Sequence, residues 1–245
     1  EIGAASGNRR QIAGTEHNIV DKYVPVGATS FRVDSTSGWQ VGDTVILHRP
    51  STAEWIADIG MNKIPQRKDG GAIVQWEAGK FDQNYERVIT RIEGDRVFLN
   101  APVMNAIEQK YGGGTVYKYE FRNRIENVGI ENLGGKSDYV GKFDENHAWN
   151  FVGINRAQDV WVRDVSANFF GRYAVFADTL SSRITVDGFH SLNPISEITG
   201  TRRYAFTIDG QYVLMKNLHS ADGRHDLVNN SPARGPNVFL NAQVT

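Results

Sequence analysis

The sequence predicts an all-β protein, a right-handed parallel β-helix (solenoid) preceded by an inserted small N-terminal β module. One observation behind this prediction is a short alternating phrase that recurs five times between residues 124 and 245, at intervals of 24 to 32 residues. A second is that a residue suited to tight turns follows most copies at the same offset. A period of this length is typical of stacked coils, in which each coil buries the apolar face of its neighbour.

The five copies share an apolar anchor and a second apolar residue two positions later. These pairs are Val128 and Ile130, Val160 and Val162, Ile184 and Val186, Val213 and Met215, and Val238 and Leu240. Such alternation is typical of a strand. Four positions after the anchors come Asn132, Asp164, Gly188, Asn217 and Ala242, most of which tolerate left-handed backbone angles. A β-sandwich, the alternative fold, does not explain why one phrase returns in one phase.

The chain is expected to have three parts. Residues 1–22 are rich in glycine and are expected to form a loosely held lead-in segment. Residues 23–120 are expected to form the small β module, with a hairpin between residues 85 and 99 around a Glu-Gly-Asp turn. The less regular stretch 51–82 includes a polar loop at residues 66–71. Residues 121–245 are expected to form the β-helix coils.

Composition excludes several classes of function. A formal net charge of −1 argues against a nucleic-acid partner, and no apolar run approaches the length of a membrane span. The absence of cysteine excludes disulfides and thiolate metal sites. The sequence begins at Glu1 with no signal peptide, and we expect a secreted or periplasmic protein from which the leader has been removed.

Four large aromatic residues in the module have two interpretations. Trp39, Trp55, Trp76 and Tyr85 offer flat faces on which sugar rings stack. Large aromatic side chains are, however, usually core or interface residues. Both interpretations remain open from the sequence.

An arginine followed by a ring precedes the first strand of successive coils. The pairs are Arg172 and Tyr173, Arg203 and Tyr204, and Arg224 and His225, while an earlier coil offers His147. Because equivalent positions of a solenoid stack about 4.8 Å apart, we expect the three arginines to share one groove. Guanidinium groups match carboxylates or sulfates in pairs of hydrogen bonds, which predicts an anionic ligand.

The alternative is that these arginines form structural ion pairs. The acidic residues available for this are Asp144, Glu145, Asp178, Asp209 and Asp226. Among the histidines, His225 is the strongest candidate for proton transfer, because it lies between Arg224 and Asp226 and imidazole titrates near neutral pH.

Several phrases together resemble the secreted bacterial pectate-lyase-like parallel β-helix family. They are Asp144-Glu-Asn-His-Ala-Trp149, Trp161-Val-Arg-Asp-Val165, Gly200-Thr-Arg-Arg-Tyr204, Gly223-Arg-His-Asp226 and Gly235-Pro-Asn-Val-Phe239. The resemblance covers residues 23–245 and implies the β-helix fold and an extracellular polysaccharide as partner. The chain lacks the Asn-Thr-Asp, Asp-Asp and Gly-His-Gly series of polygalacturonases. It also lacks a clear calcium-binding carboxylate set, so calcium, the cofactor considered, has no motif here and the metal requirement is unknown.

Within this setting the residues favour a polysaccharide lyase. β-Elimination at a uronate needs a cation for the carboxylate, a base for the C5 proton and an acid for the leaving oxygen. We assign the catalytic roles to four residues, which are His225, Tyr204, Arg203 and Arg224. We assign substrate binding to Arg172, Tyr173, His147, Glu145, Arg202 and Asp226.

Two other functions remain open. A glycoside hydrolase needs two carboxyl groups, and Glu145, Asp144 and Asp226 are the candidates. A non-catalytic glycan-binding β-helix would use the same arginines and aromatic rings without a base.

Two expectations concern the shape of the coils. The stretch 191–200 is the longest interruption between repeats, and we expect it to form a wall of the groove beside Arg203 and Tyr204. The last copy, residues 237–244, has no capping segment after it. Because an open coil leaves strand edges unpaired, we expect further β-helix coils from a continuing chain, a separate chain or a partner subunit.

Overall fold

The computed structural model describes residues 1–245 except 67, 69–71 and 231–233. Most of the polar loop expected at residues 66–71 therefore lies outside the described residues. The chain divides into two compact units, one formed by residues 1–8 and 121–245 and the other by residues 9–120.

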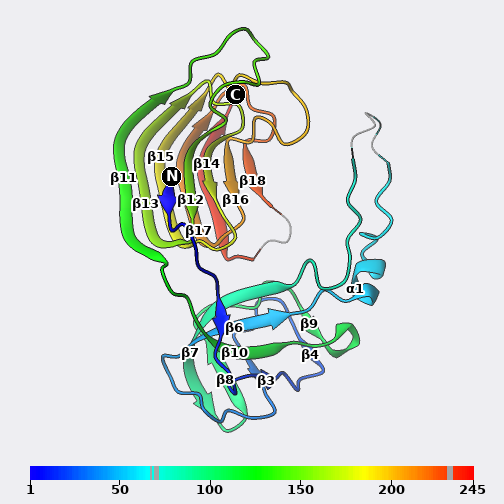
Figure 1. Ribbon diagram of the computed structural model, residues 1–245. Helices are drawn as coiled ribbons and strands as arrows, with labels where there is room; N and C mark the ends of the chain where they lie inside the picture. Colours follow the sequence, from blue (N-terminus) through cyan, green and yellow to red (C-terminus); the bar gives the residue numbers. More distant parts are fainter. Residues whose placement is uncertain (67, 69–71, 231–233) are drawn as a thin grey trace. The chain divides into compact units, whose positions relative to one another are not determined.

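The first unit contains two parallel sheets between which the chain alternates (Figure 1). One sheet has the order β1 (Ile2–Gly3), β12 (Asn150–Asn155), β14 (Tyr173–Ala177), β16 (Phe206–Ile208) and β18 (Leu227–Asn229). The other has the order β11 (Ile125–Lys136), β13 (Ala157–Asn168), β15 (Ser182–Leu192), β17 (Gln211–Ser220) and β19 (Asn237–Val244). Each coil contributes one strand to each sheet, which confirms the predicted parallel β-helix.

The alternating residues of the repeated phrase form the core of this unit. Val162, Val186 and Met215 stack in register across β13, β15 and β17, and all three are buried. Val175, Phe206 and Ile208 fill the core from the other sheet. Because strand side chains alternate between the two faces, the residues between these core positions project to the opposite side.

Each long strand bends at a residue with a left-handed backbone conformation. This corner is occupied by Asn132, Asp164, Gly188, Asn217 and Asn241, all with φ between 51° and 70°. Two corner asparagines and the residue before the Gly188 corner form a ladder, because Asn217 Nδ2 donates to Asp187 Oδ1 and Asn241 Nδ2 donates to Asn217 Oδ1, each at 2.7 Å. The ladder holds the corners of successive coils in line.

The fifth copy of the phrase is shifted by one residue from the predicted alignment. Met215 pairs with Phe239, and the corner falls on Asn241 rather than on Ala242. The expectation that Val238 and Leu240 point inward is therefore wrong, and their side chains are 48% and 55% exposed. The physical reason is that asparagine tolerates the left-handed corner and alanine does not.

The second unit is a mainly antiparallel β module with its own core. One sheet has the order β2 (Arg10–Gln11), β10 (Thr115–Glu120), β6 (Thr44–Arg49), β7 (Gln83–Glu93), β8 (Arg96–Leu99) and β5 (Ser30–Arg32), and β3 (His17–Asn18) also pairs with β10. A two-stranded sheet, β4 (Tyr23–Val24) with β9 (Ile107–Glu108), a helix α1 (Ala53–Asp58) and a 3-10 turn η1 (Gln109–Tyr111) complete it. The β7–β8 pairing confirms the predicted hairpin.

The expected lead-in at residues 1–22 is not one segment. Ile2 and Gly3 pair with Ile154 and Asn155 of β12, so the first eight residues belong to the β-helix unit. Residues 9–22 belong to the β module, where β2 and β3 pair with β10. Backbone pairing to strands roughly a hundred residues or more away decides this division, and the glycine content of the segment does not predict such pairing.

The four aromatic residues of the module do not form one platform. Trp39 and Tyr85 are buried in the core, and Trp39 Nε1 donates to Thr15 O at 3.0 Å. Trp55 and Trp76 lie with ring centroids 5.9 Å apart, and Trp76 stacks on Phe81 at 4.0 Å. For Trp39 and Tyr85 the structure supports the interpretation as core residues.

Candidate functional site

The sheet β12–β14–β16–β18 places the predicted arginine-and-ring pairs in backbone register. Tyr204 N donates to Arg172 O at 2.8 Å, and Arg224 N donates to Arg203 O at 2.9 Å. Because Val175 pairs with Phe206 and Phe206 with Leu227, the preceding rings Tyr173, Tyr204 and His225 occupy equivalent positions. The sequence repeat therefore predicts the stacking of the backbone correctly.

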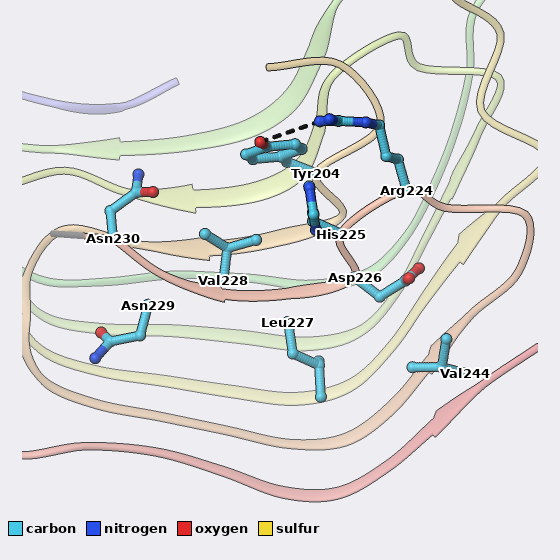
Figure 2. A pocket seen from close by; sticks show the side chains of 9 residues that line it. All are labelled: Tyr204, Arg224, His225, Asp226, Leu227, Val228, Asn229, Asn230 and Val244. Atoms are coloured by element: carbon cyan, nitrogen blue, oxygen red, sulfur yellow. Dashed lines mark hydrogen bonds between the residues drawn. The ribbon is translucent and has the colours of Figure 1, made fainter. Parts of the chain in front are cut away.

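Three of these side chains meet at a pocket of about 620 Å³. The rings of Tyr204 and His225 meet edge to face, with centroids 4.8 Å apart. Arg224 Nη1 donates to Tyr204 Oη at 3.2 Å (Figure 2). The lining residues are Tyr204, Arg224, His225, Asp226, Leu227, Val228, Asn229, Asn230 and Val244. This pocket is called the Tyr204 pocket below.

The Tyr204 pocket collects side chains from both sides of β18. Figure 2 shows Tyr204, His225 and Val228 on one side of the strand, and Leu227 and Asp226 on the other. The position of Asp226 follows from a hydrogen bond that Ser220 Oγ donates to Asp226 Oδ1. The side of the sheet with Tyr204 and His225 is called the ring face below. It is the side opposite to the core residue Phe206.

Arg172 and Tyr173 occupy the preceding coil but do not line the Tyr204 pocket. The guanidinium carbon of Arg172 lies 4.3 Å from the centroid of the Tyr173 ring, which in turn stacks on Phe176 at 4.8 Å. Burial raises the pKa of Tyr173, and the charge of Arg172 opposes this effect. This pair forms a buried extension of the ring face.

Arg203 does not join the other two arginines, which corrects the expectation of a single arginine groove. Its backbone has a left-handed φ of 57°, so its side chain leaves the alternation of the strand. Arg203 is 8% exposed as a residue, and its guanidinium donates from Nε and Nη2 to Ser196 O at 3.1 and 2.7 Å. Arg203 therefore lines a different pocket, and the catalytic role predicted for it at the Tyr204 pocket has no geometric support.

Three predicted substrate-binding residues instead hold the stretch 193–200 in place. Glu145 accepts hydrogen bonds from Ser196 Oγ, from Glu197 N at 3.1 Å and from Arg202 Nε at 2.6 Å. His147 Nε2 donates to Ile195 O at 2.8 Å, and its Nδ1 is 2.8 Å from Ser137 Oγ. These contacts occupy Glu145, Arg202 and His147, and none of the three lines the Tyr204 pocket.

The carboxylate pair required for hydrolysis does not assemble at this pocket. Burial acts to raise the pKa of Glu145, but the hydrogen bonds from Ser196, Glu197 and Arg202 lower it below its usual value. Hydrogen bonds from the backbone amides of Val140 and Asn146 lower the pKa of Asp144 in the same way. Among the described lining residues, Asp226 is the only carboxylate.

Sequence reasoning missed a polar position at the end of the same strands. Asp209 follows β16, Asn230 follows β18, and their side chains are hydrogen bonded. Burial raises the pKa of Asp209, while Asn230, Arg234 and Arg172 act in the opposite direction. Its Oδ1 atom is buried and has no hydrogen-bond partner in the described structure. The sequence contains a pattern that could have predicted this position. In both β14 and β16 the last residue points inward and an aspartate follows it directly, as in Ala177-Asp178 and Ile208-Asp209.

The described residues contain no group of three or more histidine, cysteine, aspartate or glutamate side chains placed to hold a metal ion. No helix in the part of the chain that the structure describes is long and apolar enough to cross a bilayer.

The chain was compared with known families, sequences and structures. It matches no protein-family model and no curated protein. The tailspike protein of Pseudomonas phage LKA1 is similar over 96% of this chain and 42% of its own, with 11% identity and a TM-score of 0.43. The tailspike of Acinetobacter baumannii phage AP22, solved with a capsular saccharide, covers 97% of this chain and 46% of its own, with 11% identity and a TM-score of 0.42. The tailspike of Pseudomonas phage phi297 covers 84% and 34%, with 12% identity and a TM-score of 0.42.

This chain thus spans less than half the length of each of these tailspikes. The resemblance to the pectate-lyase-like family stays a prediction, because no family model matches. What the two parallel sheets establish is the architecture, and the chain is a parallel β-helix protein.

Proposed function

We propose that this chain binds an acidic, uronate-containing polysaccharide on the ring face of the sheet β12–β14–β16–β18 and cleaves it by β-elimination. The observation that supports this proposal is the convergence of Arg224, Tyr204 and His225 at one open pocket. A cation, a phenol and an imidazole in contact are the three groups that elimination next to a carboxylate requires.

In this proposal each residue has one task. Arg224 pairs with the uronate carboxylate, which makes the C5 proton more acidic, and keeps one N–H on Tyr204 Oη. His225 takes the C5 proton. The electron pair of that C–H bond forms the C4–C5 double bond, and the C4–O bond breaks. Tyr204 gives its hydroxyl proton to the leaving oxygen. His225 then releases the C5 proton to solvent, and Tyr204 regains a proton from solvent.

Elimination is preferred to hydrolysis because of the carboxylates. Hydrolysis by the usual mechanisms needs two carboxyl groups flanking the bond, about 5 to 10 Å apart. The Tyr204 pocket has only Asp226 among the described residues, and Ser220 already occupies one of its oxygens. Asp209 does not line this pocket, although its side chain is hydrogen bonded to Asn230, which does.

The test is an incubation with a panel of uronate-containing and neutral polysaccharides, monitored by the ultraviolet absorbance of the unsaturated uronate product. The wild-type protein should produce absorbance with an acidic polymer only. The variant His225→Ala should lower kcat by about 10²- to 10⁴-fold with binding retained. His219→Ala, a histidine on the other sheet and outside the pocket, is the matched control and should keep full activity.

Other outcomes would replace the proposal. Release of reducing sugar without this absorbance would identify a hydrolase. Binding of an acidic polymer with no turnover by the wild-type protein would identify a glycan-binding module. Equal turnover by His225→Ala and wild type would remove the assignment of the base.

A further inference from the structure

A second pocket adjoins the Tyr204 pocket. It has a volume of about 490 Å³ and is lined by Lys142, Asn193, Pro194, Ile195, Ile198, Arg203, Asp222 and Gly223. On each of two coils, a residue that lines this pocket is followed directly by a residue that lines the Tyr204 pocket. These neighbours are Arg203 and Tyr204 on one coil, and Gly223 and Arg224 on the next. The second pocket is called the Arg203 pocket below. The stretch 193–198, expected as a wall of the groove, supplies one wall of this pocket.

The Arg203 pocket contains a buried cation with donors to spare. Arg203 is 8% exposed, and its three hydrogen bonds all go to neutral carbonyl oxygens. Two of the bonds share Ser196 O, and the third, at 3.4 Å, goes to Asp222 O. A guanidinium has five N–H donors, so these bonds leave part of it available. Among the described residues neither Arg203 nor Lys142 forms an ion pair, although the Asp222 carboxylate acts on Arg203 from a distance. A buried charge without a partner is costly, and an anion in the pocket would offset that cost.

The backbone keeps Arg203 in this pocket by a strained conformation. Thr201, Arg203 and Asp222 all have a positive φ, of 60°, 57° and 60°. Non-glycine residues adopt such angles at a cost and keep them where the direction of a side chain matters.

The opposite wall is apolar. Pro194, Ile195 and Ile198 face the pocket, and the side chain of Ile198 is 64% exposed. Apolar carbon beside two cations fits a ligand that has a C–H face and an anionic group, which is the chemistry of a uronate ring. Asp222 is the one carboxylate among the lining residues, and its oxygens offer acceptors to which the hydroxyls of a sugar, unlike an inorganic anion, can donate.

We propose that the Arg203 pocket is a second sugar-binding site, in which a uronate carboxylate binds Arg203 and Lys142 and the ring packs on Pro194, Ile195 and Ile198. As a subsite for the same polymer this rests on the proposed function; as a uronate site it stands by itself. A polymer that occupied both pockets would cross the backbone near Arg203 and Tyr204.

The test is a titration of the ¹⁵N-labelled full-length protein followed by backbone amide shifts, with galacturonate, galactose and inorganic sulfate as probes. Galacturonate should shift the amides of residues 195–198, 203 and 222–223, whereas galactose and sulfate should shift them weakly or not at all. Lys142→Gln, a change at an exposed side chain, should raise the Kd for galacturonate about 3- to 5-fold. Arg203→Lys keeps the charge but loses the planar fork and should raise it by about 10-fold or more.

The titration separates this proposal from the proposed function. His225→Ala should keep the galacturonate shifts at the Arg203 pocket, and Lys142→Gln should raise KM for the polymer with kcat unchanged. Arg203→Lys is a buried substitution, so if it does not fold, Lys142→Gln alone decides. The proposal is overturned if the named amides do not respond to galacturonate, if galactose or sulfate shifts them equally, or if Lys142→Gln leaves the Kd unchanged. These readings hold whether or not the wild-type protein shows turnover.

Discussion

At the scale of single residues, the ring face depends on Tyr204. Its ring meets His225 edge to face and its hydroxyl accepts from Arg224, so one side chain orders the two others. Tyr204→Phe keeps the ring contact and removes the hydroxyl. We expect kcat for elimination to fall by about 10²-fold while the Kd for the polymer changes little.

The matched control for this variant is Tyr173→Phe, at the equivalent position one coil earlier. Tyr173 lies outside the Tyr204 pocket and stacks on Phe176. Its hydroxyl should matter less than that of Tyr204. A larger loss of kcat for Tyr173→Phe than for Tyr204→Phe would place the reaction on the preceding coil and contradict the assignment of Tyr204.

Asp209 gives a prediction about pH. Burial raises the pKa of this carboxyl in the folded protein, so folding favours its protonated form. The corresponding stability is fully present below the ordinary aspartate pKa and is lost as the pH rises through the raised value. Asp209→Asn, which cannot ionise, should therefore have a higher Tm than wild type at neutral pH, because the folded protein no longer holds a buried carboxylate.

The measurement is thermal unfolding of both proteins across a pH series. The difference in Tm between Asp209→Asn and wild type should shrink as the pH falls below the ordinary aspartate pKa. If Asp209→Asn were less stable at neutral pH, the ion-pair contribution of Arg172 and Arg234 would outweigh burial.

At the scale of elements, the corner ladder fixes the register of the long strands. Asn217 has a φ of 54° and is hydrogen bonded to Asp187 below and Asn241 above. Asn217→Ala should destabilise the β-helix unit by about 2 kcal/mol, since it adds left-handed strain and removes the ladder bonds. Asn217→Gly relieves the strain and should cost only about 1 kcal/mol.

Denaturant unfolding of the three proteins measures these two contributions. Gly188 occupies the equivalent corner one coil earlier, which shows that glycine fits the backbone there. Equal destabilisation by alanine and glycine would mean that the left-handed angle contributes nothing at Asn217.

The stretch 193–200 should loosen when Glu145 loses its charge. Burial acts to raise the pKa of Glu145, but its hydrogen bonds lower it, so the stabilisation is present above the ordinary glutamate pKa and is lost as the pH falls through the lowered value. Glu145→Gln at neutral pH should speed amide hydrogen exchange at Glu197 by about 10-fold, because a charge-assisted bond is worth about 1.5 to 3 kcal/mol.

Activity separates this structural role from a catalytic one. Glu145 does not line the Tyr204 pocket, so Glu145→Gln should keep kcat on the polymer. A loss of kcat comparable to that of His225→Ala would return Glu145 to the catalytic residues.

At the scale of the whole molecule, the chain has two separate cores. One is built on the β-helix strands and the other on the antiparallel module. We expect two calorimetric transitions rather than one. Ile2→Ala should lower the transition of the β-helix unit, and Ile107→Ala that of the module, each by about 2 kcal/mol or more, because both side chains are buried.

A single two-state transition that both substitutions lower equally would contradict this picture. The assignment of Ile2 is the sharper part of the prediction. It tests whether β1, at the start of the chain, is part of the sheet with β12.

Features that depend on local alternation and on its repetition can be predicted from the amino-acid sequence alone. Val162, Val186 and Met215 point into the core because a strand alternates with period two, and Tyr173, Tyr204 and His225 share a position because equal phrases pair in equal register. The parallel β-helix and the position of the Tyr204 pocket follow from these two rules.

Other features depend on a single backbone angle or on a distant partner, and these are visible only in the folded chain. A left-handed φ turns Arg203 away from Tyr204, and nothing in the repeat distinguishes it from Arg224. Hydrogen bonds to the stretch about fifty residues further on engage Glu145 and His147, and Glu145 also pairs with Arg202. The corner at Asn241 shifts the last strand by one residue. The side-chain directions of these residues are set by local backbone angles and by contacts between distant segments, which residue type and spacing do not encode.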